Sequence, residues 1–172
     1  MEQIEHNIDP FFDLNSQILI LGSFPSPKSR KTGFYYGHPR NRFWKTLCGA
    51  FNDKIVPNSI FEKKQYLKTR KIALWDVVAS CQIHGASDSS IKNVYYNDLH
   101  YIINTAPIQL IVTTGKKADS LFRKRWSKDP VINKISYLNL PSTSPANASM
   151  NLAQLIKNYH QIIDVLRRKD KE

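Results

Sequence analysis

Four short apolar runs, separated by helical patterns, constrain the fold of this chain more than any other feature of its sequence. The first run covers residues 17–21 and ends at Gly22, and comparable runs cover residues 72–78, 108–113 and 135–140. Short apolar runs bounded by turn residues are typical of strands that are buried on both faces. Strands that alternate with helices predict an α/β fold, here with three αβα layers around a central, mainly parallel four-stranded sheet.

The segments between these runs have the spacing of amphipathic helices. Phe43, Leu47 and Phe51 recur every four residues, which places them on one face of a helix. Asn97 is a favoured capping residue and predicts a helix that contains Leu99 and is ended by a proline. Further helices are predicted at residues 61–70, around residues 121–122 and at residues 151–168.

The length of 172 residues suits one domain, residues 1–172, which we expect to carry an N-terminal extension at 1–14 and a charged tail at 167–172. Cys48 and Cys81 are too few for a disulfide framework and lack the spacing of a metal site. No apolar run approaches the roughly 18 residues of a membrane span. The chain begins with acidic and polar residues where a secretory leader would be basic and then apolar. We therefore expect a cytoplasmic monomer that needs no metal, cofactor or membrane.

The charge of the chain points to a polyanionic partner. Twenty-five Lys and Arg against fourteen Asp and Glu give a formal net charge of +11. Such a surface attracts nucleic acid, although it also suits solubility or binding to anionic lipid.

Two loops contain most of the unusual residues and are predicted to meet. In parallel sheets, ligands bind beyond the carboxyl ends of the strands. The early loop (residues 22–44) follows the first run, and the late loop (residues 141–147) follows the last. Both should lie at the same edge of the sheet.

The early loop reads GSFPS at residues 22–26 and GFYYGHPRNRFW at residues 33–44. It resembles the first loop of mismatch-specific uracil-DNA glycosylases, which carry Gly-Ile-Asn-Pro-Gly and then His-Pro-Ala-Asn-Arg-Phe-Trp-Lys. It is more similar to the hypoxanthine-DNA (DNA-deoxyinosine) glycosylases of the same uracil-DNA glycosylase superfamily. Their first motif is Gly-Ser-apolar-Pro, and their second loop resembles LPSTSPAN at residues 140–147. The likeness extends over roughly residues 17–166.

This resemblance implies a monofunctional DNA glycosylase of the base excision repair type. Such an enzyme binds double-stranded DNA and hydrolyses the N-glycosidic bond of a deaminated base, here hypoxanthine first, by direct attack of water and without a cofactor. Two alternatives remain: removal of uracil or of a mispaired thymine, and a non-catalytic DNA-binding domain of the same fold.

The catalytic amide is expected at Asn41. In the uracil-removing branches, the third residue of the first motif is an Asn or Asp that positions water, but Phe24 occupies that place here. The resemblance to the deoxyinosine branch implies that Asn41 supplies the amide instead. An Asn oxygen can accept a hydrogen bond from water while the nitrogen donates one. Alternatively, Asn41 only caps the helix that follows.

The base pocket is expected to combine close backbone approach, aromatic stacking and polar contacts. Glycine lets backbone amides approach the departing base, and aromatic rings can stack on a flipped base or can simply pack. The carboxylate of Asp76 can accept the N1 hydrogen of hypoxanthine, or it can cap a turn or pair with a basic residue. His38 can contact the leaving base or be structural. The expected base-binding residues are Gly22, Ser23, Phe24, Pro25, Tyr35, Tyr36, His38 and Asp76.

DNA contacts outside the base pocket are expected from the late loop and from basic residues at the same edge. Hydroxyl and ammonium groups bind backbone phosphates. The alternatives are an ordinary turn and solvated charges, and Asp88 reads as the start of a helix. The expected DNA-binding residues are Lys28, Arg30, Lys116, Ser142, Thr143, Ser144 and Asn147.

Overall fold

The computed structural model, which describes residues 2–172, has a four-stranded parallel sheet at its centre. The strand order is β3-β2-β6-β7, and each neighbouring pair is parallel. The predicted α/β architecture is confirmed. The strands are β2 (Ile18–Gly22), β3 (Ile72–Asp76), β6 (Leu110–Thr114) and β7 (Ser136–Leu140).

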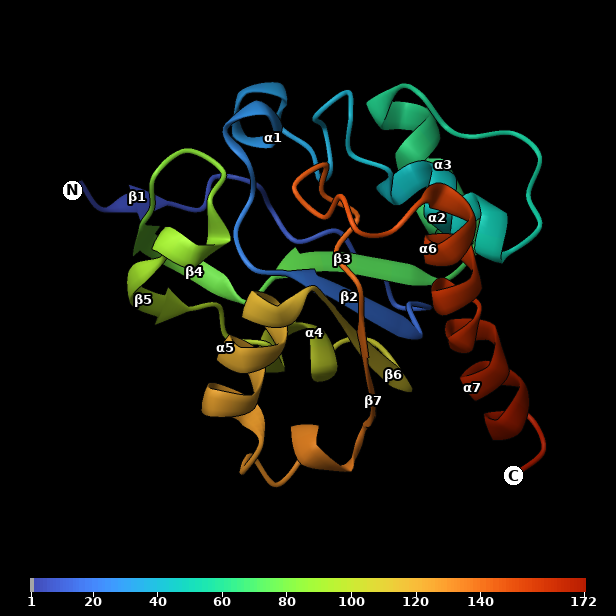
Figure 1. Ribbon diagram of the computed structural model, residues 1–172. Helices are drawn as coiled ribbons and strands as arrows, with labels where there is room; N and C mark the ends of the chain where they lie inside the picture. The colour runs from blue at the N-terminus through green and yellow to red at the C-terminus, as the bar shows by residue number, and fades with distance from the viewer. Residues whose placement is uncertain (1) are drawn as a thin grey trace.

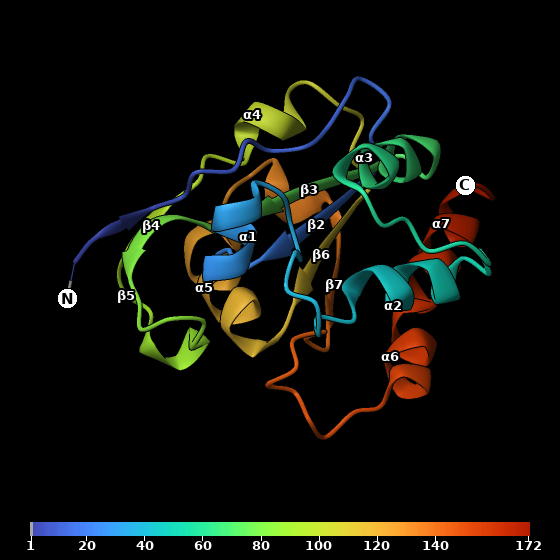
Figure 2. The ribbon, with the colours of Figure 1, turned by 90° about the horizontal axis from the view of Figure 1, so that it is seen from above.

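Helices cover both faces of this sheet. Figure 1 shows α2, α3, α6 and α7 gathered on one side and α4 and α5 on the other, and the view from above in Figure 2 agrees. This is the three-layer arrangement that the alternation of strands and helices predicts. The helices are α1 (Pro27–Thr32), α2 (Phe43–Ala50), α3 (Ile60–Thr69), α4 (His100–Ile103), α5 (Lys116–Trp126), α6 (Leu152–Tyr159) and α7 (Gln161–Lys169).

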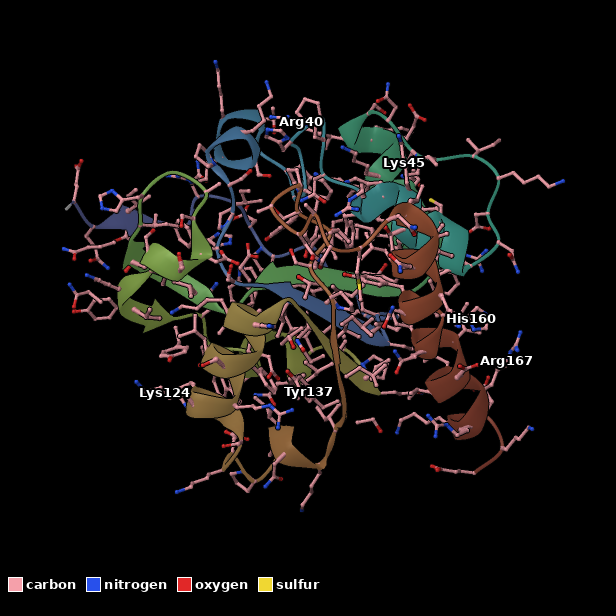
Figure 3. The ribbon with its side chains drawn as sticks, in the orientation of Figure 1. Arg40, Lys45, Lys124, Tyr137, His160 and Arg167 are labelled. Carbon is pink, nitrogen blue, oxygen red and sulfur yellow. The ribbon has the colours of Figure 1, made fainter. Side chains whose placement is uncertain are left out.

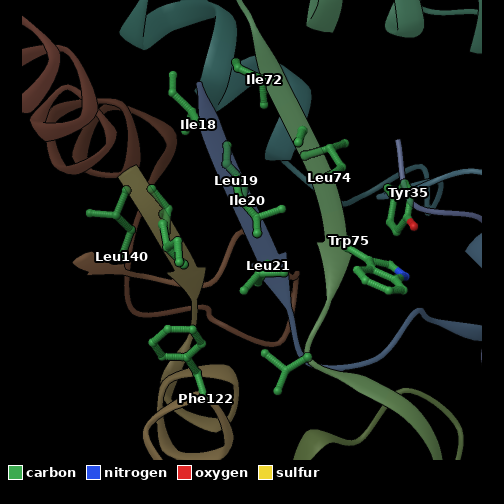
Figure 4. Close-up of a cluster of buried hydrophobic side chains, with 14 of the residues drawn as sticks. Ile18, Leu19, Ile20, Leu21, Tyr35, Ile72, Leu74, Trp75, Phe122 and Leu140 are labelled. Carbon is green, nitrogen blue, oxygen red and sulfur yellow. The ribbon is translucent and has the colours of Figure 1, made fainter. Parts of the chain in front are cut away.

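The core is built around the central strand β2. Ile18, Leu19, Ile20 and Leu21 are all buried, since helices cover both faces of the strand (Figure 4). A continuous apolar run is what such a strand requires. Leu74 of β3 is buried beside it, in register with Ile20. The core therefore fixes the position of Gly22, where β2 ends and the early loop begins.

A second, antiparallel sheet was not predicted from the sequence. Its strand order is β1-β4-β5, with β1 (Ile4–Glu5), β4 (Val78–Gln82) and β5 (Lys92–Tyr96). The apolar run at residues 72–78 is thus not one strand, because it contains all of β3 and the start of β4. The expected N-terminal extension is part of the fold, since β1 pairs with β4 and Phe11 forms a bridge to Leu74.

Two helical predictions are corrected by the structure. Asn97 does not cap a helix: its buried amide donates to the carbonyl oxygens of Asp76 (2.9 Å) and Val78 (3.2 Å). The predicted final helix at 151–168 is two helices, α6 and α7, separated at His160. The charged tail begins inside α7, which extends to Lys169. Within residues 2–172, no helix is both long and apolar enough to span a membrane.

Candidate active site

A cavity of about 100 Å³ lies at the carboxyl ends of β2, β3 and β6. The early and late loops close over it side by side at one edge of the molecule (Figures 1 and 2). This is the edge at which the sequence places the site. The predicted residues that line the cavity are Gly22, Ser23, Phe24, Pro25, Tyr35, Tyr36, Asn41, Asp76, Ser142, Thr143 and Ser144.

Gly22 and Asp76 form the meeting point of β2 and β3. They are partners in the parallel register, so the Asp76 carboxylate lies beside the glycine. A Cβ atom on Gly22 would lie 2.5 Å from Asp76 Oδ1 and 3.4 Å from the hydroxyl oxygen of Tyr36. Glycine is required here because any larger residue would displace the carboxylate. Two polar oxygens thus converge on one point of the cavity wall.

The Asp76 carboxylate is almost fully shielded from solvent. Its side chain is 6% exposed, and its Oδ2 lies 2.8 Å from Nε2 of His6, whose side chain is 4% exposed. A buried charge needs a hydrogen-bond partner, and His6 supplies it. The sequence left open whether Asp76 contacts the base, caps a turn or pairs with a basic residue. In the structure, Oδ2 pairs with a ring nitrogen of His6, and Oδ1 lies on the cavity side next to Gly22.

Tyr36 places a hydroxyl group with no partner in the wall of the cavity. Its oxygen is buried, and among residues 2–172 it has no hydrogen-bond partner. Burial raises the pKa of Tyr36 and the nearby negative charge of Asp76 raises it further, which outweighs the lowering effect of the nearby Thr114 hydroxyl, so the Tyr36 hydroxyl keeps its proton. The residue has φ of 54°, and its ring stacks on Phe43 with centroids 3.7 Å apart. A non-glycine residue in this region is strained, and such strain is concentrated at functional sites.

Phe24 and Tyr35 supply aromatic surface to the same cavity. The ring of Phe24 is buried and meets the His6 ring edge-on at 5.9 Å. The hydroxyl of Tyr35 is already used, since it donates to the carbonyl oxygen of Asp9 at 2.8 Å. Tyr35 therefore holds the N-terminal segment with its polar end and borders the cavity with its ring.

Asn41 borders the cavity and also contacts the start of α2, although the N-cap position is Arg42 and not Asn41. Its Oδ1 accepts from the backbone amide of Phe43 (2.9 Å), the first residue of α2, and from the hydroxyl of Thr143 (2.8 Å). The amide of Phe43 can only donate, so the atom facing it is the oxygen. Both lone pairs of Oδ1 are then occupied, and Nδ2 has no partner within residues 2–172. Asn41 borders the cavity with a free donor.

Arg42 ties the late loop to the early loop. Its guanidinium donates to the carbonyl oxygens of Ser144 (3.2 Å) and Asn147 (2.9 Å), and its backbone amide donates to that of Thr143 (3.1 Å). Asn147 is held inside the loop by a 2.9 Å bond from its Nδ2 to the carbonyl oxygen of Ser142. The late loop is thus fixed in place before any ligand arrives, which favours a preorganised site.

Asp88 reaches the cavity from the loop between β4 and β5. Its Oδ1 accepts a 2.7 Å hydrogen bond from the hydroxyl of Ser23, so that hydroxyl is spent within the protein. Desolvation and the charge of Asp76 raise the pKa of Asp88, against the opposing effects of Ser23 and Lys117. The helix-start reading also holds, because Asp88 begins a short 3-10 helix, Asp88–Ser90.

The remaining predicted residues do not line the cavity. Lys28 and Lys116 are exposed at the starts of α1 and α5, and His38 accepts a bond from the Arg40 backbone amide within the early loop. The guanidinium of Arg30 lies over the Phe24 ring, 5.6 Å from its centroid. Lys45 and Arg40 add positive charge at the edge where the early loop lies (Figure 3).

Sequence reasoning missed His6 and Arg42, and it interpreted Asp88 only as the start of a helix and not as part of the cavity lining. His6 stands in a segment that matched no known motif, and its partner is 70 residues away along the chain. The HPRNRFW motif contains Arg42 and could have drawn attention to it. Within residues 2–172, no three His, Cys, Asp or Glu residues gather as metal ligands would, and both cysteines are buried and unpaired.

Comparisons with known proteins agree on one family. Residues 10–167 match the model of the uracil DNA glycosylase superfamily. A hypoxanthine DNA glycosylase of Methanosarcina barkeri is 33% identical over 80% of this chain and 85% of its own length. One from Methanosarcina acetivorans is 33% identical over 84% of this chain and 89% of its own. The solution NMR structure of a candidate uracil DNA glycosylase from M. acetivorans superposes with a TM-score of 0.72 at 29% identity, covering 91% of this chain and 97% of that one.

Proposed function

This chain belongs to the uracil DNA glycosylase superfamily, and we propose that it removes hypoxanthine from DNA by hydrolysing the N-glycosidic bond of deoxyinosine. In this reaction the oxygen of a water molecule bonds to C1′ of the deoxyribose. The bond between C1′ and N9 breaks, and its electron pair leaves with the base. The attached water then loses one proton to solvent and the base anion takes one up, so the products are neutral hypoxanthine and a sugar with a hydroxyl at C1′. The transition state resembles an oxocarbenium ion, so the site must hold water and stabilise a departing anion.

The observation that carries the proposal is the pair of oxygens beside Gly22. Asp76 Oδ1 is an acceptor, and the protonated hydroxyl of Tyr36 can donate. A deaminated base presents the complementary edge, with a ring N–H next to a carbonyl oxygen. Adenine presents a bare nitrogen and an amino group there, and the Asp76 carboxylate repels the bare nitrogen. With Asp76 Oδ1 at N1 and the Tyr36 hydroxyl at the carbonyl oxygen, the pocket is complementary to hypoxanthine, and in that placement it does not fit adenine.

The backbone of the early loop is suited to the leaving base. The amides of Ser23 and Phe24 donate to no acceptor within residues 2–172. Amides fixed in a solvent-poor site stabilise a developing negative charge without reorganising. Phe24 adds a ring on which a flipped base can stack.

Asn41 is proposed to hold the attacking water. Because its oxygen is occupied, Nδ2 donates to the water oxygen and fixes its position, and Asn41 does not act as the base that removes a proton. Late attack on a cationic sugar does not demand a strong base. Thr143 acts through Asn41 by holding the amide in this orientation.

DNA outside the base pocket is proposed to contact the two loops and the basic residues around them. We propose that the hydroxyls of Ser142 and Ser144 bind phosphates that flank the flipped nucleotide and that exposed ammonium groups track the backbone. Contrary to the expectation from the sequence, Thr143 is not among these contacts, because it is 1% exposed and its hydroxyl donates to Asn41. The proposed residues are Lys28, Arg30, Lys116, Ser142, Ser144 and Asn147.

The test is base release from duplexes that carry one deoxyinosine, one deoxyuridine or one G·T mismatch, scored as strand breaks after alkali. We expect the fastest release from deoxyinosine. Release from deoxyuridine or the mismatch alone would replace hypoxanthine with a pyrimidine substrate, and no release from any duplex would leave a DNA-binding domain. Asn41→Ala should slow single-turnover release by about 100-fold or more while DNA binding persists, by analogy with the loss of one preorganised donor in other enzymes.

A further inference from the structure

The N-terminal segment (residues 2–12) reaches the cavity wall through His6. Two contacts place the residue: β1 pairs with β4, and the backbone amide of His6 donates to the carbonyl oxygen of Ala79 at 2.7 Å. Farther along, Phe11 forms a bridge with Leu74 of β3. The segment is therefore attached on both sides of His6, and the imidazole ring is held at the end of β3.

The backbone determines which nitrogen of His6 carries the proton. The amide of Ile8 donates to Nδ1 of His6 at 3.3 Å, so Nδ1 acts as an acceptor. In a neutral imidazole the other nitrogen then carries the hydrogen. Nε2–H points at Asp76 Oδ2, 2.8 Å away. The ring is enclosed by Phe24 and Tyr35, with centroids at 5.9 Å and 6.2 Å, and the low polarity of these surroundings strengthens the bond.

We infer that His6 is a positioning residue for base recognition. Its Nε2–H fixes one oxygen of Asp76, so the other oxygen is presented to the flipped base as a hydrogen-bond acceptor and nothing else. This inference rests on the proposed function, since it assigns His6 to the site that reads the base. It gives the N-terminal segment a part in substrate selection as well as in folding.

The selectivity of the site depends on this fixed acceptor. An unattached carboxyl group can rotate and turn either oxygen toward the base or away from it. A carboxylate that receives a hydrogen bond on Oδ2 from His6 keeps one orientation, with Oδ1 beside Gly22. The other charged or titratable groups near it are Asp88, Tyr35 and Tyr36, and none of them is within hydrogen-bond distance of Asp76.

Two substitutions separate a positioning role from a role in packing. His6→Phe keeps an aromatic ring of similar size and removes the donor. His6→Gln keeps an N–H donor near the place of Nε2. The matched control is His100→Phe, because Nε2 of His100 likewise donates to an aspartate oxygen, Oδ2 of Asp129, at 2.7 Å, but on α4 and outside the cavity lining.

The measurements are single-turnover release of hypoxanthine and of adenine, each at saturating enzyme, together with thermal unfolding. We expect His6→Phe to slow hypoxanthine release by about 10- to 100-fold, which corresponds to the loss of one hydrogen bond to a charged group. The ratio of the hypoxanthine release rate to the adenine release rate should also fall. His6→Gln should recover most of the rate, and His100→Phe should match the unchanged protein. Equal rates for His6→Phe and the unchanged protein would overturn the inference, as would equal losses in all three variants.

A second measurement does not depend on catalysis. Nitrogen-15 NMR of the imidazole in the unchanged protein should show His6 with its proton on Nε2, and the signal should change in Asp76→Asn. A proton on Nδ1 would contradict the inference even if the enzyme is active. If the unchanged protein releases no base while the NMR result holds, the proposed function fails and the placement of His6 stands.

Discussion

Gly22→Ala should disable base recognition while leaving the fold intact. The new Cβ atom would lie 2.5 Å from Asp76 Oδ1, whereas ordinary contact begins at 3.4 Å, so the carboxylate oxygen must move by 3.4 − 2.5, about 0.9 Å. Asp76 cannot move freely because His6 holds its other oxygen and both side chains are buried. A displacement of about 1 Å at a reacting group can cost about 100-fold in rate. We expect single-turnover release of hypoxanthine to fall by that order.

The control for Gly22→Ala is the same substitution at Gly49 in α2. A Cβ atom there would also lie 2.5 Å from a side-chain atom, Cδ1 of Ile156 in α6, and neither residue lines the cavity. Overpacking of this kind costs about 1–3 kcal/mol of stability, partly offset in a helix by the better propensity of alanine. Urea unfolding should show a lower free energy of unfolding in both variants, whereas the rate of hypoxanthine release should fall only in Gly22→Ala. Normal release by Gly22→Ala, or an equal loss in Gly49→Ala, would refute the reasoning.

Three further predictions concern charge and polarity around the cavity. Replacing Lys28 and Lys116 by alanine should weaken binding to all duplexes alike. The slope of log affinity against log salt concentration should become less negative by about 0.9 for each phosphate that the protein no longer neutralises, and an unchanged slope would exclude both lysines from the interface. Tyr36→Phe should slow hypoxanthine release yet raise the free energy of unfolding by about 1 kcal/mol, because it removes a buried hydroxyl with no partner among residues 2–172. Single-turnover rates and thermal melting curves test this, and unchanged release together with a lower melting temperature would contradict it. Asp88 has a raised pKa in the folded state, so its contribution to stability is full at low pH and is lost as the pH rises through that pKa. Asp88 is exposed overall although its carboxyl group accepts from Ser23, so the effect on stability is small. Asp88→Asn should be slightly more stable than the unchanged protein at pH 7 and lose that advantage at pH 3 in urea unfolding, and the same difference in stability at both pH values would contradict desolvation as the cause of the raised pKa.

The main sheet was predictable because its signal is local. The run that becomes β2 is apolar from Ile18 to Leu21, and the residue that ends it, Gly22, marks the edge where the site lies. The second sheet was not predictable in this way. β5 is mostly exposed, so its residues carry no apolar run, and the boundary between β3 and β4 lies within one run of the sequence.

The candidate site was predictable where a motif carried it and not where pairing across the chain built it. Asn41 belongs to a recognisable motif, but the occupation of its oxygen depends on Thr143, 102 residues away. Asp76 could be placed at the end of a strand from the sequence. Its partner His6 belongs to the N-terminal segment, which lies along the edge of β3 that does not pair with β2 and contains no motif. Side-chain pairs of this separation follow from the fold and not from local sequence.

The most direct test of the central claim is base release from matched duplexes that carry deoxyinosine or deoxyadenosine, compared between the unchanged protein and Asp76→Asn. In the variant, the His6 donor should attract the amide oxygen and leave the amide nitrogen, a donor, facing the base. Facing donors cost about 1–3 kcal/mol, so hypoxanthine release should fall by about 10- to 100-fold. We expect the unchanged protein to release hypoxanthine and leave adenine in place, and Asp76→Asn to lose this preference. Equal hypoxanthine release by the two proteins would contradict it.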